Sequence, residues 1–230
     1  MDRRREVRRT YERIGSHFAE TRAYAWPEVE AFVEDIPRSL DDADARTDPI
    51  IGLDLGCGNC RHAEVLASHV DRVVGVDVSR SLLDAGRERA RERSFADALD
   101  PLQADAARLP IGTDAVDCGL YVATLHHLPT METRRASLDE LARVLDAGGR
   151  ALVSVWSTAH DRFDDRSEAD TTGFDTTVEW TLPGGTVVDR FYHIYAPDEF
   201  ERDLAASGLD VLAREMSSGN CYATVAGPDA

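Results

Sequence analysis

Apolar residues recur along the chain at two spacings, and the switch between them predicts an α/β fold. From Val7 to Phe18 they follow a helical spacing, and a second helix begins at Pro27. Short apolar runs predict buried strands at 50–53, 72–76, 115–122 and 150–156 and near Leu102. Between them, helices are predicted after a glycine-rich turn, at 79–93 and at 131–145, with Gly148-Gly149 ending the last one. This alternation predicts a parallel sheet covered by helices on both faces.

The last third of the chain departs from the alternation. Residues 157–175 are polar and predict a loop, and residues 177–182 and 186–195 predict an inserted β-hairpin around Pro183-Gly184-Gly185. After a helix at 197–207, two strands at 209–216 and 221–225 are joined so closely that they must be antiparallel neighbours. We therefore expect a doubly wound, mostly parallel seven-stranded sheet with an antiparallel C-terminal hairpin, N-terminal helices and a β-hairpin insertion.

Composition narrows the classes of chemistry and the setting. With 230 residues the chain fits one domain, and it contains no lysine, which excludes P-loop, Schiff-base and kinase-type sites. The 43 acidic and 26 basic residues give a net charge of -17, which we interpret as halophilic adaptation, with a GC-rich genome as the alternative. No apolar run of about 18 residues occurs and the first residues are charged, so we expect a cytoplasmic protein without a membrane span.

The N-terminal arginines and the cysteine pair bear on nucleic-acid and metal binding. The acidity argues against a DNA-binding protein, but six arginines between residues 3 and 13 form a basic arm that either contacts phosphate or is a solvated helix face. Cys57 and Cys60 supply two ligands where zinc needs four, so we expect no metal.

A cluster of glycines and aspartates at the predicted strand ends points to a cofactor. Gly56 and Gly58 let the backbone turn sharply where open α/β sheets bind ligands. A dinucleotide fingerprint would need glycine at position 61, which is arginine, so NAD and FAD are disfavoured. Asp54, Asp77 and Asp105 follow successive strands and suit a ligand with an amino group, a ribose and a positive charge, unless each merely caps the next helix.

The segments DLGCGNC, VVGVDVS, ADAARLP, VDCGLYVATLHHL and LARVLDAGGRALVSV resemble the class I S-adenosylmethionine-dependent methyltransferases, with their Rossmann-like fold, over residues 50–156. The resemblance implies S-adenosyl-L-methionine as cofactor and Cys60 in place of a third glycine. By this resemblance, Asp54, Gly56 and Gly58 hold the methionine end of the cofactor, Asp77 holds the ribose, and Asp105 with Ala106 holds the adenine. The backbone from Tyr121 to Ala123 lines the methyl-transfer opening. Tyr11 either covers the cofactor or only packs in the protein interior.

Flanking segments narrow the resemblance. Tyr11-Glu12-Arg13-Ile14, His17-Phe18, Thr21-Arg22, Trp26-Pro27, His126-His127, Val155-Trp156 and Arg190-Phe191-Tyr192-His193 resemble the tRNA wobble-uridine carboxymethyl methyltransferases. That family esterifies a carboxymethyl group on a wobble uridine, which implies tRNA as substrate. It also implies a small zinc-ribbon activator at the sheet edge near Leu102. The chain departs from the family at Cys221, where a tryptophan is usual.

This organisation divides the single domain into four parts. They are an N-terminal helical cap and linker at 1–48, a cofactor-binding core at 49–156, a substrate-side insertion at 157–195 and a C-terminal helix and hairpin at 196–230.

The expected chemistry needs a cation more than a base. A carboxylate is already ionised at neutral pH, so Arg22 or Arg190 would clamp it bidentately. Arg190 and Tyr192 share one face of a strand, and Tyr192 or Trp26 would stack on the base. His126 or His127 would donate a hydrogen bond or be structural. Two alternatives stay open: a small-molecule O- or N-methyltransferase with a histidine base, and a non-catalytic cofactor-binding domain.

Overall fold

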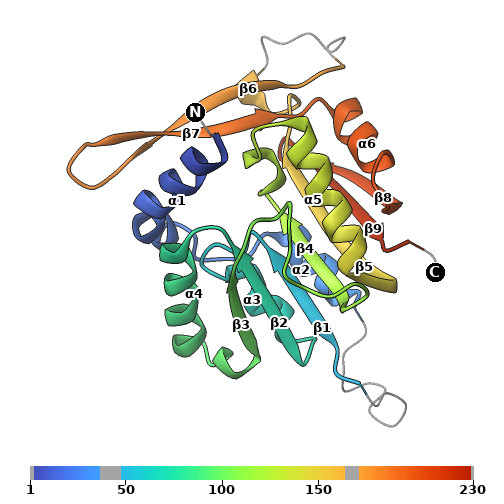
Figure 1. Ribbon diagram of the computed structural model, residues 1–230. Helices are drawn as coiled ribbons and strands as arrows, with labels where there is room; N and C mark the ends of the chain where they lie inside the picture. The colour runs from blue at the N-terminus through green and yellow to red at the C-terminus, as the bar shows by residue number, and fades with distance from the viewer. Residues whose placement is uncertain (1–2, 37–47, 164–170, 229–230) are drawn as a thin grey trace.

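The computed structural model describes residues 3–36, 48–163 and 171–228 and is built around one seven-stranded sheet (Figure 1). Its strands are β1 (Ile51–Leu55), β2 (Arg72–Asp77), β3 (Leu99–Gln103), β4 (Val116–Val122), β5 (Leu145–Trp156), β8 (Asp210–Ser217) and β9 (Asn220–Ala226). Their order is β3-β2-β1-β4-β5-β9-β8. The first five are parallel, and β9 is antiparallel to both β5 and β8. The predicted doubly wound sheet with its antiparallel C-terminal hairpin is confirmed.

Helices cover both faces of this sheet. They are α1 (Arg3–Glu20), α2 (Pro27–Glu34), α3 (Arg61–Leu66), α4 (Arg80–Glu92), α5 (Met131–Val144) and α6 (Pro197–Ala205). Leu138 of α5 and Leu204 of α6 are fully buried in one core cluster, and Val33 of α2 and Leu66 of α3 are fully buried in another. Two separate apolar layers explain why the inner strands are apolar throughout rather than alternating.

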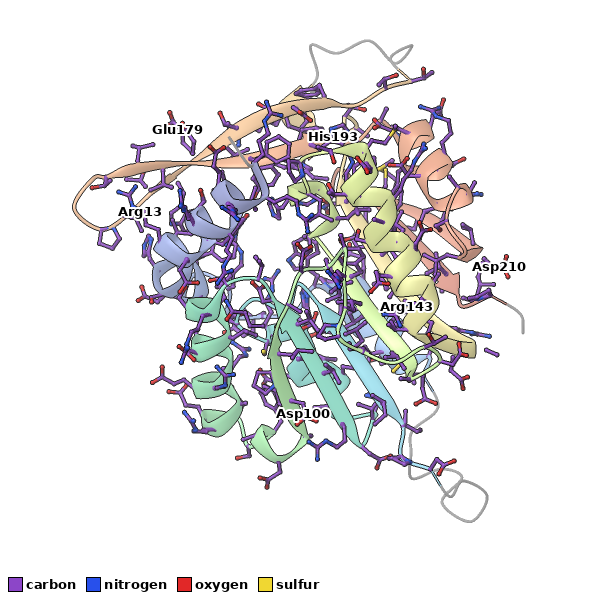
Figure 2. All side chains as sticks on the ribbon, viewed as in Figure 1. Arg13, Asp100, Arg143, Glu179, His193 and Asp210 are labelled. Carbon is purple, nitrogen blue, oxygen red and sulfur yellow. The ribbon has the colours of Figure 1, made fainter. Side chains whose placement is uncertain are left out.

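The inserted hairpin forms a second sheet of its own. Its strands β6 (Phe174–Thr181) and β7 (Val187–Ile194) run antiparallel and lie beside α1, across the end of the main sheet (Figure 1). Figure 2 labels His193 on the hairpin. One of its ring nitrogens lies 2.9 Å from Asp175 Oδ1 of β6, and the other lies 3.0 Å from Glu199 Oε1 and so ties the hairpin to α6. Trp180 Nε1 donates to His17 Nδ1 of α1 at 3.1 Å. The hairpin and α1 therefore cover the carboxyl ends of the parallel strands, and we call these elements together the roof.

Helix α1 is docked on α4 by a glycine and a carboxylate. The N-terminus of α4 is capped by Ser79, and Glu12 adds a second cap because its Oε2 accepts the Arg80 N–H at 2.8 Å. A Cβ on Gly15 would collide with Ser81, so only glycine lets the two helices approach this closely.

Several predicted boundaries were wrong by a few residues. Strand β1 extends to Leu55, so Asp54 lies inside the strand rather than at its end. Strand β5 begins at Leu145, so Gly148 and Gly149 lie within it and the helix ends before them, at Val144. Residues 174–175 belong to β6 rather than to the predicted loop. Residues 41–47 of the linker predicted at 41–48, and residues 164–170 of that loop, lie outside the described residues. None of the helices in the described part of the chain has the length and apolar character needed to cross a bilayer.

Candidate active site

A cavity of about 430 Å³ lies between the carboxyl ends of the parallel strands and the roof made by α1 and the hairpin. Its size is in the range of small-molecule and cofactor sites, about 300–1,000 Å³. The residues lining it include Arg4, Tyr11, Phe18, Arg22, Trp26, Gly56, Gly58, Asp77, Asp105, Ala106, Val122, Ala123, His126, His127, Trp156, Arg190 and Tyr192. Most of the residues predicted from the sequence therefore surround one space.

The turn after β1 forms the floor of the cavity. Gly56 and Gly58 have φ of +79° and +53°, a region that favours glycine. A Cβ on Gly58 would meet nothing within 4 Å, so this backbone is open to the cavity. Cys60, in place of a third glycine, adopts φ +60° and is fully buried against Gly86. The cysteine therefore keeps the turn of the loop and points away from the space.

The three aspartates do not play equivalent parts. Asp77 Oδ2 accepts the Gly58 N–H at 2.9 Å and Oδ1 accepts the Ser79 N–H at 2.8 Å, at the cavity wall. Burial raises the pKa of Asp77 to about 6, against the effect of these N–H donors. Asp105 also lines the cavity and forms an ion pair with Arg4.

Asp54 and Tyr121 do not line the cavity, contrary to the sequence-based expectation. Asp54 is buried behind the loop, where its Oδ2 accepts the Ala63 N–H of α3 at 3.0 Å, and burial raises its pKa to about 7. Tyr121 is fully buried and donates to Ser137 Oγ at 2.9 Å, because its side chain points toward α5. The helix-capping alternative therefore describes Asp54, and at the fourth strand the lining begins at Val122.

The opposite wall carries a buried arginine without a carboxylate. Arg190 is 6% exposed and its Nη1 donates to the Tyr192 hydroxyl at 2.7 Å, which confirms that both face the same side of β7. Its guanidinium lies 5.0 Å from the Trp180 ring centroid, and its Nε is buried without a partner. Among the described residues, no carboxylate forms an ion pair with it.

The second predicted cation, Arg22, has its backbone beside the glycine loop and its guanidinium beside two aromatic rings. Arg22 is 4.5 Å from the Phe18 ring centroid, and its carbonyl accepts from Asn59 Nδ2 at 2.9 Å. Arg22 and Arg190 both lie beside the same two rings, Phe18 and Trp180. These two guanidiniums therefore lie in the same part of the cavity, whose lining also includes Arg4, Arg61 and Arg162.

Hydrogen bonds fix the tautomers of the two histidines, which lie in a 3₁₀ turn at Leu125–His127. His127 Nδ1 lies 3.1 Å from the Phe191 carbonyl, so it carries the proton and Nε2 accepts from the Tyr11 hydroxyl at 2.9 Å. His126 Nδ1 accepts the Trp156 N–H at 3.1 Å, so its Nε2 carries the proton. Burial lowers the pKa of both rings, that of His127 to about 4. Both imidazole lone pairs are already engaged.

Two contributors were missed at the sequence level. Arg4 was one of six arginines in a basic arm, and nothing in the pattern distinguished it as the partner of Asp105. Trp180 comes from the inserted hairpin, and its ring lies beside the guanidiniums of Arg22 and Arg190. The alternation of apolar and polar residues in this strand could have indicated that Trp180 faces the protein interior, but not which element its side chain contacts.

Comparison with known proteins gives the following similarities. Residues 53–153 match the family model described as "Methyltransferase domain". A tRNA (carboxymethyluridine(34)-5-O)-methyltransferase of Arabidopsis thaliana is 32% identical over 67% of this chain and 33% of its own length. The protein of that name from Schizosaccharomyces pombe is 24% identical over 94% of this chain and 93% of its own length. The chain thus spans about a third of the first relative and most of the second.

Solved structures show the same fold at low identity. An S-adenosylmethionine-dependent methyltransferase from Clostridium acetobutylicum has a TM-score of 0.66 and 12% identity, covering 93% of this chain and 98% of its own. A putative methyltransferase solved with the Haloferax volcanii Trm112 methyltransferase activator has a TM-score of 0.68 and 15% identity, covering 97% and 98%. These similarities establish the architecture in which the cavity lies.

Proposed function

Because the chain belongs to the S-adenosylmethionine-dependent methyltransferases, we propose that it methylates the carboxylate of a carboxymethyl group on the wobble uridine of tRNA. The relatives of that name support the acceptor, and the charges in the cavity support it independently. The chain spans only about a third of one such relative and is 24% identical to the other, so the identity of the acceptor is what the experiment must test.

The cavity has the features that the cofactor needs. Gly58 leaves open space beside the Asp77 carboxylate. That carboxylate keeps free lone pairs that can accept hydrogen bonds from the ribose hydroxyls. Asp105 and Ala106, which also line the cavity, would hold the adenine by resemblance. S-adenosylmethionine supplies a methyl group on a positively charged sulfur. The backbone at Val122 and Ala123 lines the space between this wall and Arg190.

The observation that carries the proposal is the uncompensated charge of Arg190. Burying a guanidinium without an anion costs several kcal/mol, so a site that retains one is organised for an anionic ligand. Of the arginines that line the cavity, Arg190 would hold the carboxylate of the acceptor, and Arg22, whose guanidinium lies beside the same two rings, would hold that of the cofactor. The Arg190 fork and the His126 Nε2–H would position the acceptor oxygens.

The engaged histidines favour this acceptor over a phenol or an amine. A nucleophile of high pKa needs a base, but the lone pairs of His126 and His127 already accept hydrogen bonds from Trp156 and Tyr11. A carboxylate arrives ionised and requires alignment with the methyl group in a dry site. The arrangement therefore performs catalysis by positioning rather than by proton transfer.

The proposed activator would meet strand β3, which is an edge of the sheet. The Ala104 N–H donates to Asp77 of β2, so by alternation Pro101 and Gln103 direct their backbone groups outward. Proline has no N–H, which leaves Gln103 as the outward donor in this part of the strand. A complex with such an activator, known for one structural neighbour, supports a partner here. Full activity of the pure protein would remove this part of the proposal.

Nucleoside analysis tests the acceptor directly. Purified protein is incubated with S-adenosylmethionine labelled in the methyl group and tRNA that carries the free carboxymethyl acid. We expect a base-labile methyl ester on the wobble nucleoside, and loss of that ester with accumulation of the acid in a strain lacking the gene. Methyl transfer to a small molecule of the cell extract, with an unchanged tRNA profile, would contradict the proposal.

A further inference from the structure

The segment that connects α1 to α2 passes the rim of the cavity with its backbone held in place. Asn59 donates to the Arg22 carbonyl at 2.9 Å, Arg89 to the Ala23 carbonyl at 2.6 Å, and Arg61 to the Tyr24 carbonyl at 3.1 Å. Three consecutive carbonyls therefore have partners outside the segment. A side chain on this segment is presented in a defined place.

Tyr24 is that side chain. It is 81% exposed, the most exposed of the large hydrophobic residues in the described ranges. Its neighbours at two positions on either side, Arg22 and Trp26, line the cavity, so Tyr24 lies at the rim. An aromatic ring held outward at the mouth of a site has one free face for stacking.

Positive charge lies beside this segment, where Arg61 donates to the Tyr24 carbonyl and also lines the cavity. The Arg61 guanidinium lies 5.2 Å from the Trp26 ring centroid, and burial together with the nearby Arg22 and Arg89 lowers its pKa to about 10. Arg89 is paired with Glu64 at 2.7 Å, whereas no carboxylate within residues 3–36, 48–163 and 171–228 forms an ion pair with Arg61. In a chain of net charge -17, such a cluster is locally complementary to an anion.

Resting on the proposed function, we propose that Tyr24 and Arg61 form a docking platform for the RNA strand beside the methyl acceptor. Tyr24 stacks on a neighbouring base, and Arg61 contacts a phosphate. A small acceptor fits inside the cavity and does not reach Tyr24, but a polynucleotide that inserts one nucleotide must cross the rim. The platform thus distinguishes a nucleotide within a strand from the same nucleotide when free.

The test compares Tyr24→Ala, Tyr24→Phe and the control Leu212→Ala, which truncates an exposed apolar residue on β8. Because stacking contributes about 1–3 kcal/mol per base, we expect KM for tRNA to rise roughly 5- to 150-fold in Tyr24→Ala. Tyr24→Phe should restore it, and kcat and the affinity for S-adenosylhomocysteine should stay unchanged in all three. Activity on the free carboxymethyl nucleoside should also be unaffected.

The charge contribution is measured by fluorescence anisotropy with an anticodon stem-loop RNA over a range of salt concentrations. Arg61→Ala should reduce the slope of log affinity against log salt by about one, whereas the exposed Arg93→Ala should leave it unchanged.

The outcomes separate the platform from the proposed function. If the wild-type protein methylates tRNA and Tyr24→Ala keeps its KM and RNA affinity, the platform is wrong and the function stands. If the wild-type protein fails to methylate tRNA but its RNA affinity depends on Tyr24 and Arg61, the platform stands and the acceptor is wrong. Absence of any RNA binding overturns both.

Discussion

The buried charge of Arg190 should bind an anionic ligand but lower the free energy of unfolding of the ligand-free protein. Replacing Arg190 by methionine removes a buried, unpaired cation, so we expect the melting temperature to rise by about 2–4 °C. Methylation of tRNA should fall at least 30-fold, as expected for loss of about 2 kcal/mol of charge-assisted hydrogen bonding. Affinity for S-adenosylhomocysteine, measured by calorimetry, should change less than twofold.

The matched control for this substitution is Arg135→Met. Arg135 pairs with the buried Asp203 at 2.7 Å, far from the cavity lining, so its loss leaves an uncompensated carboxylate. This variant should melt earlier and keep its methylation activity. A destabilised Arg190→Met would show that Arg190 stabilises the fold, and the argument for an anionic acceptor would be lost.

The raised pKa of Asp77 predicts how the affinity for the cofactor depends on pH. Its pKa of about 6 in the ligand-free protein means that it binds a proton as the pH falls from 8 to 5. An ionised carboxylate is the better acceptor for ribose hydroxyls, so affinity for S-adenosylhomocysteine should be highest above pH 6. Below that value it should fall by up to tenfold per pH unit.

Calorimetry of Asp77→Asn checks the assignment. The amide has no proton to gain, so this variant should bind more weakly at pH 8 and lose little more affinity toward pH 5. Asp54 titrates in the same range, with a pKa of about 7, and remains in both proteins. If wild type and Asp77→Asn show the same pH dependence, Asp77 is not the group responsible.

At the scale of elements, the docking of α1 on α4 should control cofactor affinity, because α1 supplies part of the roof. Gly15→Val forces a side chain against Ser81, and we expect a loss of about 1–3 kcal/mol, as for other overpacked contacts. Amide exchange in α1 should become faster, and affinity for S-adenosylhomocysteine should decrease. Gly112→Val, where the nearest atom to a Cβ is 3.8 Å away, is the control. Unchanged exchange in Gly15→Val would refute this view of the roof.

The elements themselves were predictable because each follows from a local pattern. Alternating strands and helices fixed the parallel sheet, and Gly56 and Gly58 marked the turn because their positive φ favours glycine. The contacts between α1 and α4 were not predictable. Glu12 and Arg80 lie 68 positions apart, and a surface glutamate on one helix carries no sign that it caps another.

The same limit explains the errors at individual sites. Asp54 and Asp77 look alike in sequence, one near the end of each strand, yet one binds the next helix and the other the cavity wall. Which carboxylate faces the ligand depends on how far each strand extends, and boundaries are the least certain part of a sequence-based assignment. The unpaired state of Arg190 depends on every neighbour in three dimensions.

Across the whole molecule, the net charge of -17 implies self-repulsion that salt should relieve. The Debye length falls from about 10 Å at 0.1 M to about 3 Å at 1 M, so the excess of acidic over basic groups is screened in that range. Ion pairs such as Arg87 with Asp84 weaken over the same range, but acidic residues outnumber basic ones by 43 to 26. We therefore expect a net gain of about 1–2 kcal/mol, or roughly 5 °C in melting temperature.

Scanning calorimetry in KCl tests this at the level of the whole chain. Neutralising the exposed Glu88, Glu92 and Asp97 to their amides lowers the excess of negative charge, so this variant should be more stable than wild type at 0.1 M. The two proteins should converge near 1 M, because screening removes the difference between them. A melting temperature that is independent of salt, or a variant that rises with salt as steeply as wild type, would show that self-repulsion does not limit stability. The acidic composition would then reflect codon usage rather than adaptation to salt.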